Sequence, residues 1–188
     1  SCKIPREDRS AVRPLLTEEQ LRQGVARMAR QISDHYAQRP LTIVAVLTGS
    51  VVLLADLIRL LDMPLRVGVI QTSSYRGPTT TRAPLVINSD LMLDITGRDV
   101  LLVDDIFDTG NTLVEVIARM KELEPESLRS VVLLRKHGRC EVDMEPDFAA
   151  FEIPNEFVVG YGLDYHDQYR NLPYVATLQP EDLTDNPP

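Results

Sequence analysis

Residues 100–113 constrain the fold of this chain more than any other segment, because they join an apolar run to a turn that can bind an anion. The run at 100–103 contains only valine and leucine, which is typical of a parallel strand covered on both faces. Asp104 and Asp105 follow directly, and open α/β sheets bind ligands at the carboxyl ends of their strands. The segment therefore predicts an α/β fold with the two acids beside the ligand.

The acid pair leads into a short polar turn before the next expected helix. The residues of this turn are Asp108, Thr109, Gly110, Asn111 and Thr112. Successive backbone N–H groups of such a turn can converge on a phosphate where the helix begins. The two carboxylates can accept hydrogen bonds from sugar hydroxyls or hold a divalent metal ion. A ribose 5-phosphate would engage both parts, so the segment indicates a phosphorylated sugar as ligand.

Two other interpretations of the same residues are open. The turn could serve only to cap the helix, and an acid pair also occurs in the phosphoacceptor cluster of receiver domains. A receiver domain, however, carries its acid pair after the first strand, near the N-terminus, and does not continue into Asp-Thr-Gly-Asn-Thr. Position and continuation both favour the phosphate-binding turn.

The acid pair and the turn closely resemble the signature of the type I phosphoribosyltransferases. In that family two acidic residues bind the ribose hydroxyls, and the following loop holds the 5-phosphate of phosphoribosyl pyrophosphate. The resemblance implies that Asp104 and Asp105 bind the hydroxyls and that residues 108–112 bind the phosphate. It also implies the family's α/β fold: a central, mainly parallel twisted sheet flanked by helices, with a small hood and a flexible lid loop.

The rest of the chain fits alternating helices and strands. Thr17 and Gln20 form a capping box, followed by one apolar helical face made of Leu21, Val25, Met28, Ala29, Ile32 and Tyr36. Further strands are expected at 41–47, 66–72, 85–91, 100–103, 130–134 and 157–161, and helices at 51–61 and 112–123. We expect one domain over 1–188, with its core at about 15–145 and a hood from N-terminal residues and about 146–178.

Composition excludes several classes of protein. No apolar run approaches the ~20 residues that span a bilayer, so no membrane association is expected. A net charge of −8 and a pI near 4.9 argue against nucleic acid as a partner. The first residues lack the apolar stretch of a secretory signal, so a cytoplasmic location is expected.

A second anion site is expected where the strand at 41–47 ends. Backbone N–H groups at Thr48 and Gly49 could face an anion at the same sheet edge, although such a turn most often only caps a helix. By the resemblance this loop binds pyrophosphate, often through a cis peptide that would fall near residues 47 and 48. Arg170 matches the family arginine that contacts pyrophosphate, with an exposed arginine as the alternative.

The polar loop after residue 72 resembles the family's lid. Residues 73–83 are rich in Gly, Pro and Thr without periodicity, and Ser74 and Tyr75 match the Ser-Tyr of that loop in purine phosphoribosyltransferases. Closure would keep water from an oxocarbenium-like ribose. An ordinary loop is the alternative.

Residues 152–165 closely resemble the hood of the hypoxanthine-guanine phosphoribosyltransferases. The resemblance implies that Phe157 stacks on the purine, that the backbone of Val158 reads its edge, that Lys136 bonds the 6-oxo group and that Asp164 helps hold Mg²⁺. An ammonium group has only donors, so Lys136 would select a 6-oxo acceptor over the 6-amino group of adenine. Without the resemblance, Phe157 would read as core and Lys136 as part of a solvated turn.

Together the two motifs imply an enzyme of purine salvage. It would transfer the phosphoribosyl group of phosphoribosyl pyrophosphate to hypoxanthine or guanine, with Mg²⁺ as cofactor, giving IMP or GMP. Asp108 is the candidate catalytic residue, because the family places it near purine N7, where a carboxylate can take the ring proton. Xanthine as the base and a noncatalytic regulator that senses phosphoribosyl pyrophosphate are the alternatives. The family resemblance suggests a homodimer or homotetramer.

Overall fold

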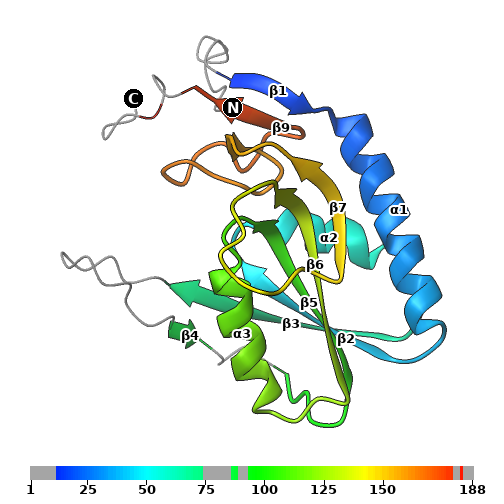
Figure 1. Ribbon diagram of the computed structural model, residues 1–188. Helices are drawn as coiled ribbons and strands as arrows, with labels where there is room; N and C mark the ends of the chain where they lie inside the picture. Colours follow the sequence, from blue (N-terminus) through cyan, green and yellow to red (C-terminus); the bar gives the residue numbers. More distant parts are fainter. Residues whose placement is uncertain (1–11, 74–85, 89–92, 180–182, 184–188) are drawn as a thin grey trace, which may run out of the picture.

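The central sheet has six strands in the order β4-β3-β2-β5-β6-β7 (Figure 1). The structure, a computed structural model, describes residues 12–73, 86–88, 93–179 and 183. The strands are β2 (Leu41–Leu47), β3 (Leu65–Ser73), β4 (Val86–Asn88), β5 (Asp99–Phe107), β6 (Ser127–Lys136) and β7 (Phe148–Ile153). Five are parallel, and only β4 runs antiparallel to its neighbour. The mainly parallel α/β sheet expected from the sequence is confirmed.

Helix α1 (Glu18–Tyr36) begins at the predicted capping box. The Thr17 hydroxyl accepts from the backbone N–H of Gln20, and the Gln20 side chain accepts from the backbone N–H of Thr17. All six residues of the predicted apolar face are buried. Gly24 adds a close approach, since a Cβ there would lie 2.0 Å from the Phe151 ring of β7. The helix therefore packs directly on the sheet.

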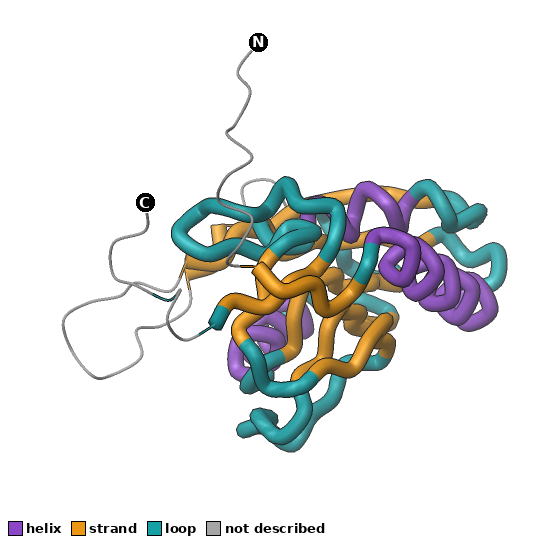
Figure 2. Tube along the Cα trace, turned by 90° about the horizontal axis from the view of Figure 1, so that it is seen from above, coloured by secondary structure: helices purple, strands orange, loops and turns teal. Residues whose placement is uncertain are grey.

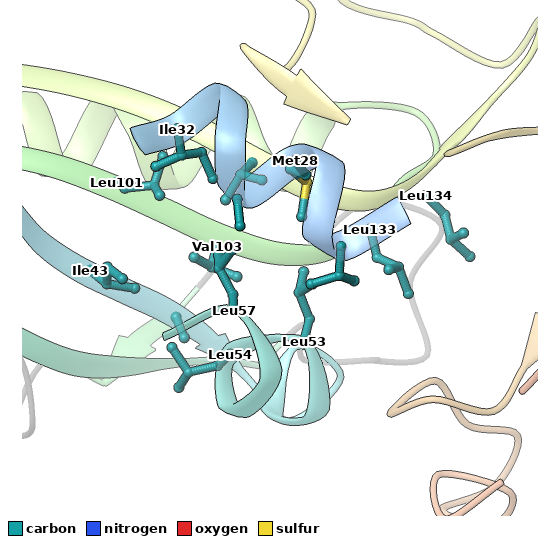
Figure 3. Close-up of a cluster of buried hydrophobic side chains, with 14 of the residues drawn as sticks. Met28, Ile32, Ile43, Leu53, Leu54, Leu57, Leu101, Val103, Leu133 and Leu134 are labelled. Atoms are coloured by element: carbon teal, nitrogen blue, oxygen red, sulfur yellow. The ribbon is translucent and has the colours of Figure 1, made fainter. Parts of the chain in front are cut away.

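Two apolar clusters cover the two faces of the sheet. In one, α1 and α2 (Val51–Ile58) direct side chains such as Met28 and Leu53 toward strand residues such as Val103 (Figure 3). In the other, α3 (Asn111–Lys121) packs Leu113, Val116 and Met120 against the opposite face. Seen from above, helices lie on both sides of the strands (Figure 2). The result is a three-layer arrangement around parallel strands.

The hood is a separate three-stranded antiparallel sheet in the order β1-β9-β8. Its strands are β1 (Val12–Leu16), β8 (Phe157–Val159) and β9 (Val175–Leu178), and it lies above the carboxyl ends of β6 and β7 in Figure 1. The expected boundary at about residue 146 needs correction. Residues 148–153 form β7, which pairs in parallel with β6 and so belongs to the core sheet.

Strand β5 is longer than expected, which changes where the acids sit. It continues to Phe107, so Asp104 and Asp105 lie within its last residues rather than after its end. Parallel pairing with β6 continues beyond the acids as far as Phe107 and Arg135, and this fixes their backbone.

None of the helices in the described part of the chain combines the length and apolar character needed to cross a bilayer.

Candidate functional site

Most of the predicted site residues line one cavity at the carboxyl ends of β2 and β5, and Lys136 lies outside this lining. Its volume is about 320 Å³, and Asp164 and Arg170, from the segment between β8 and β9, contribute to its lining. Ten predicted residues line it: Thr48, Gly49, Asp104, Asp105, Asp108, Thr109, Gly110, Thr112, Asp164 and Arg170. Three separate stretches of the chain therefore contribute to one site, as expected for ligands at the carboxyl edge of a parallel sheet.

The acid pair is held by backbone bonds in a desolvated position. Asp104 Oδ1 accepts from the N–H of Asp105 at 2.9 Å, and Asp105 Oδ1 accepts from the N–H of Ile106 at 2.8 Å. Burial, and then the adjacent charge of Asp105, raises the pKa of Asp104 well above its usual range. Burial also raises the pKa of Asp105. A ligand that brings hydroxyl donors or a cation therefore stabilises the ionised form of the two carboxylates.

Gly49 lies against this acid pair. A Cβ at Gly49 would fall 1.6 Å from Asp105 Oδ2, so the backbone after β2 and the carboxylate are in direct contact. The peptide between Leu47 and Thr48 is cis, at the position that the family resemblance implied. Ser50, fully buried, donates from its hydroxyl to the Val46 carbonyl at 2.6 Å and closes the turn. The predicted pyrophosphate loop thus borders the predicted ribose-binding acids.

The predicted phosphate turn leads into α3 through a left-handed residue. Gly110 has φ +85°, and a Cβ there would lie 2.4 Å from Val142, so only glycine suits the position. The helix begins at Asn111, and a helix N-terminus favours an anion. The Asn111 side chain turns aside, donating to Glu141 Oε2 at 2.8 Å and to Thr109 Oγ1 at 3.1 Å. It does not line the cavity.

Asp108 lies between two cations, one at the end of β6 and one shortly after it. Lys136 Nζ is 3.3 Å from Asp108 Oδ2, and Arg139 Nε is 3.1 Å from Oδ1. The Lys136 side chain is only 8% exposed, so its charge is held by this carboxylate. Asp108 Oδ1 is buried and accepts no hydrogen bond from the residues that the structure describes, because the Arg139 contact lacks hydrogen-bond geometry. One oxygen of Asp108 therefore retains its capacity to accept a proton.

Arg170 reaches the cavity from the hood. Its Nη1 donates to the Gly162 carbonyl at 2.9 Å, and its Nη2 lies 2.8 Å from Asp164 Oδ1 and 3.2 Å from Asp167 Oδ1. Gly162 in turn touches Gly49, since a Cβ at Gly162 would lie 2.1 Å from the Gly49 carbonyl oxygen. Arg170 and Asp164 are thereby held beside the predicted pyrophosphate loop.

Phe157 and Val158, the predicted base-binding residues of the hood, lie outside the cavity lining. The Phe157 ring is 40% exposed and meets the Tyr165 ring edge-on at 5.5 Å, which leaves surface for a flat ligand. Val158 is 5% exposed and pairs with Thr177, so only its backbone is suited to reading a base. The predicted lid residues Ser74 and Tyr75 lie outside the described residues.

Sequence reasoning gave no specific role to three residues of this region. Arg139 was part of a cation cluster that also fitted a solvated turn. Its position three residues after Lys136 was the feature from which its place beside the site could have been predicted. Thr72, at the end of β3, lines the cavity. Tyr161 bonds to Asp56 across 105 residues, and no local pattern predicts such a pair.

The donor set suits Mg²⁺ only as an ion that arrives with substrate. No group of three His, Cys, Asp or Glu side chains among the described residues is arranged to hold a metal ion. Asp104, Asp105 and Asp164 nevertheless line one cavity. Protein Mg²⁺ sites often use one or two carboxylates together with substrate phosphates and water. The residues present therefore fit a Mg²⁺ ion shared with a diphosphate.

Comparisons with known proteins agree with this geometry. Residues 13–166 match the family model described as the phosphoribosyl transferase domain. A hypoxanthine-guanine phosphoribosyltransferase of Staphylococcus aureus is 40% identical over 89% of this chain and 93% of its own length. That of Staphylococcus epidermidis is 41% identical over the same shares.

Solved structures show the same similarity. A hypoxanthine-guanine phosphoribosyltransferase from Bacillus anthracis superimposes with a TM-score of 0.83 at 37% identity, covering 88% of this chain and 98% of that one. For a hypoxanthine phosphoribosyl transferase of Trypanosoma cruzi the TM-score is 0.86 at 38% identity, over 94% and 96% of the two chains. A lysine-to-arginine mutant of the Trypanosoma cruzi enzyme was solved with the product IMP. Its TM-score is 0.83 at 37% identity, over 95% and 96% of the two chains.

Proposed function

The chain belongs to the hypoxanthine-guanine phosphoribosyltransferase family, and we propose that it transfers the 5-phosphoribosyl group of phosphoribosyl pyrophosphate to hypoxanthine or guanine. The products are IMP or GMP and pyrophosphate, a reaction of purine salvage. The observation that carries the proposal is one cavity with an acid pair between two anion-binding turns. A ribose with a 5-phosphate at one end and a diphosphate at C1 has this same order of groups.

Each part of the sugar phosphate then has an assigned partner. Asp104 and Asp105 accept hydrogen bonds from the ribose hydroxyls, which relieves the burial of their charge. Backbone N–H groups of residues 108–112, at the start of α3, bind the 5-phosphate. The backbone at Thr48 and Gly49, together with the Arg170 guanidinium, binds the pyrophosphate.

The base lies between the hood and the end of β6. Phe157 offers an exposed aromatic face for stacking, and the Val158 backbone reads the ring edge. Lys136 donates to the 6-oxo group, which favours hypoxanthine and guanine over adenine. When the Lys136 ammonium leaves Asp108 to bond the 6-oxo group, its charge stays paired with an acceptor.

Asp108 acts as the proton acceptor. Purine N9 forms a bond to ribose C1 as the bond from C1 to the pyrophosphate oxygen breaks. The proton on N7 passes to Asp108 Oδ1, the oxygen that accepts no hydrogen bond from the described residues, so that no positive charge remains on the ring. Ser74 and Tyr75 stay predicted lid residues that keep water from the ribose at this stage.

Asp164, with Asp104 and Asp105, would hold Mg²⁺ together with the diphosphate. When bound, the ion would neutralise charge that develops on the leaving pyrophosphate.

We also propose a homodimer or homotetramer, because the oligomeric state of the Trypanosoma cruzi relative was studied together with its activity. Light scattering of the purified protein measures this directly. The expected cytoplasmic location stays a prediction.

The test is ultraviolet-monitored turnover of hypoxanthine, guanine, xanthine and adenine with phosphoribosyl pyrophosphate, with and without Mg²⁺. Mg²⁺-dependent conversion of hypoxanthine or guanine, with adenine unused, is the expected result. Efficient use of xanthine alone would replace the proposed base. Tight binding of phosphoribosyl pyrophosphate without conversion of any base would favour a regulator instead.

A further inference from the structure

The hood segment that carries Arg170 is tied to α2 by one hydrogen bond. Tyr161 Oη donates to Asp56 Oδ2 at 2.6 Å, and the tyrosine is only 7% exposed. Burial and the Asp56 carboxylate raise the pKa of Tyr161 far above its usual range, so the phenol stays protonated and remains a donor. Arg59, the residue directly after α2, forms an ion pair with Asp56 and holds its carboxylate.

The backbone around Tyr161 has an unusual conformation. Gly160, Tyr161 and Gly162 have φ values of +95°, +51° and +100°, in the left-handed region that ordinary residues avoid. Both glycines lack side chains, so Tyr161 is the one residue of the three whose side chain can fix the segment. Its backbone N–H also donates to the Leu172 carbonyl at 2.9 Å, across the same hood loop.

Gly162 connects this segment to the pyrophosphate side of the cavity. The Gly162 N–H donates to the Arg170 carbonyl at 3.0 Å, and Arg170 Nη1 donates back to the Gly162 carbonyl at 2.9 Å. On its other side Gly162 contacts the carbonyl of Gly49. A shift of Gly162 would therefore move Arg170 and disturb Gly49 together.

We propose that Tyr161 and Asp56 are positioning residues that set Arg170 and the Gly49 turn for binding the pyrophosphate end of the substrate. The proposal rests on the proposed function, since it names how that site is held. Neither residue touches substrate; Asp56 fixes Tyr161, Tyr161 fixes Gly162, and Gly162 fixes both anion-binding elements. The purine-binding groups Lys136 and Phe157 lie on other elements and are outside this chain of contacts.

The proposal therefore predicts a selective defect. Tyr161→Phe removes the phenol hydroxyl, and Asp56→Ala removes the carboxylate that accepts from it, so both should raise the KM for phosphoribosyl pyrophosphate about tenfold. The KM for hypoxanthine should stay unchanged. The double variant should lose no more than either single variant, because both remove one contact. Asp56→Asn should restore most of the loss, since its amide oxygen can still accept from the phenol.

The experiment is steady-state kinetics of these variants in the full chain with hypoxanthine, phosphoribosyl pyrophosphate and Mg²⁺. Tyr174→Phe is the matched control, because it removes a phenol hydroxyl from the same hood segment outside the Asp56 contact and should leave both KM values normal. A normal KM for phosphoribosyl pyrophosphate in Tyr161→Phe, or equal increases in both KM values, would overturn the proposal. If Tyr161→Phe fails to fold, the Asp56→Ala and Asp56→Asn pair decides.

Calorimetric titration with phosphoribosyl pyrophosphate separates this inference from the function. Weaker binding by Tyr161→Phe than by the wild type supports the inference even if the wild type shows no turnover, an outcome that would remove the proposed reaction alone. Equal binding by the two proteins overturns the inference even if turnover is normal. Absence of any binding by the wild type overturns both.

Discussion

Lys136 Nζ lies 3.3 Å from Asp108 Oδ2, which joins the last residue of β6 to the turn after β5. The residue proposed to read the purine carbonyl is thus paired with the residue proposed to take the purine proton. Arg139 approaches the other carboxylate oxygen at 3.1 Å, so each oxygen of Asp108 faces a positive charge. In the proposed function, base recognition and proton transfer would therefore be coupled at one carboxylate.

Replacing Asp108 tests the proton-transfer role. Asp108→Asn keeps the size of the side chain but removes the proton acceptor, so kcat should fall about 10²–10³-fold. The KM values for both substrates should change far less. Steady-state kinetics checks this, and a nearly normal kcat would rule out Asp108 as the base.

Replacing Lys136 tests base selection. Lys136→Met keeps the length of the side chain and removes the donor, so the KM for hypoxanthine should rise about tenfold or more while adenine is rejected less strictly. The measurement is kcat/KM for each base. Arg135→Met is the matched control, because the Arg135 guanidinium pairs with Glu145 and Glu152 instead. Unchanged discrimination in Lys136→Met would assign base selection elsewhere.

Gly49→Ala tests the contact between the turn after β2 and the acid pair. The new Cβ would displace the Asp105 carboxylate, which lies at the end of a short side chain. We expect kcat/KM for phosphoribosyl pyrophosphate to fall about 10²-fold, as a misplaced binding group commonly causes, with little change in Tm. Gly97→Ala is the control, because a Cβ there meets nothing within 4 Å. It should cost about 1 kcal/mol through its φ of +63° and leave activity intact. Full activity of Gly49→Ala would contradict the assigned contact.

Asp104→Asn tests whether function and stability oppose each other at the acid pair. Because the folded-state pKa of Asp104 lies well above its unfolded value, the folded protein binds the extra proton, and stability falls as pH rises from about 4 through the folded-state pKa. At pH 7 the variant should therefore be more stable than wild type by about 1–3 kcal/mol, although its activity is reduced. The advantage should shrink toward pH 4. Thermal unfolding across this pH range measures both trends.

Asp94→Asn should change stability in the opposite direction and serves as a comparison. The Thr96 backbone N–H lowers the pKa of Asp94, so this carboxylate stabilises the folded state at neutral pH and loses that effect as pH falls through its folded-state pKa. The variant should be less stable than wild type at pH 7, with the gap closing in acid. An Asp104→Asn protein that behaved like Asp94→Asn would contradict the desolvation argument.

The sequence predicted those parts of the structure that local patterns encode. The buried face of α1, from Leu21 to Tyr36, follows from helical periodicity, and the capping box at Thr17 fixed its start. The strand and turn at 100–112 carry the acid pair and the phosphate turn in consecutive residues. Ten of the predicted residues line one cavity, because parallel strands bring their carboxyl ends to one edge.

Long-range pairing explains what local patterns could not predict. Strand β1 is a five-residue segment interrupted by Pro14, and its pairing with β9 joins residues about as far apart as the chain allows. No strand was predicted at 148–153, and these residues were assigned to the hood because no local pattern indicates that they pair with β6. The bond between Tyr161 and Asp56 likewise depends on how the hood meets α2.

The most direct test of the account is mass spectrometry of the products from hypoxanthine, phosphoribosyl pyrophosphate and Mg²⁺. We expect IMP and pyrophosphate in equal amounts, because transfer of the phosphoribosyl group to the base releases one pyrophosphate for each nucleotide formed. Ribose 5-phosphate and pyrophosphate without IMP, or no products at all from folded protein, would contradict it.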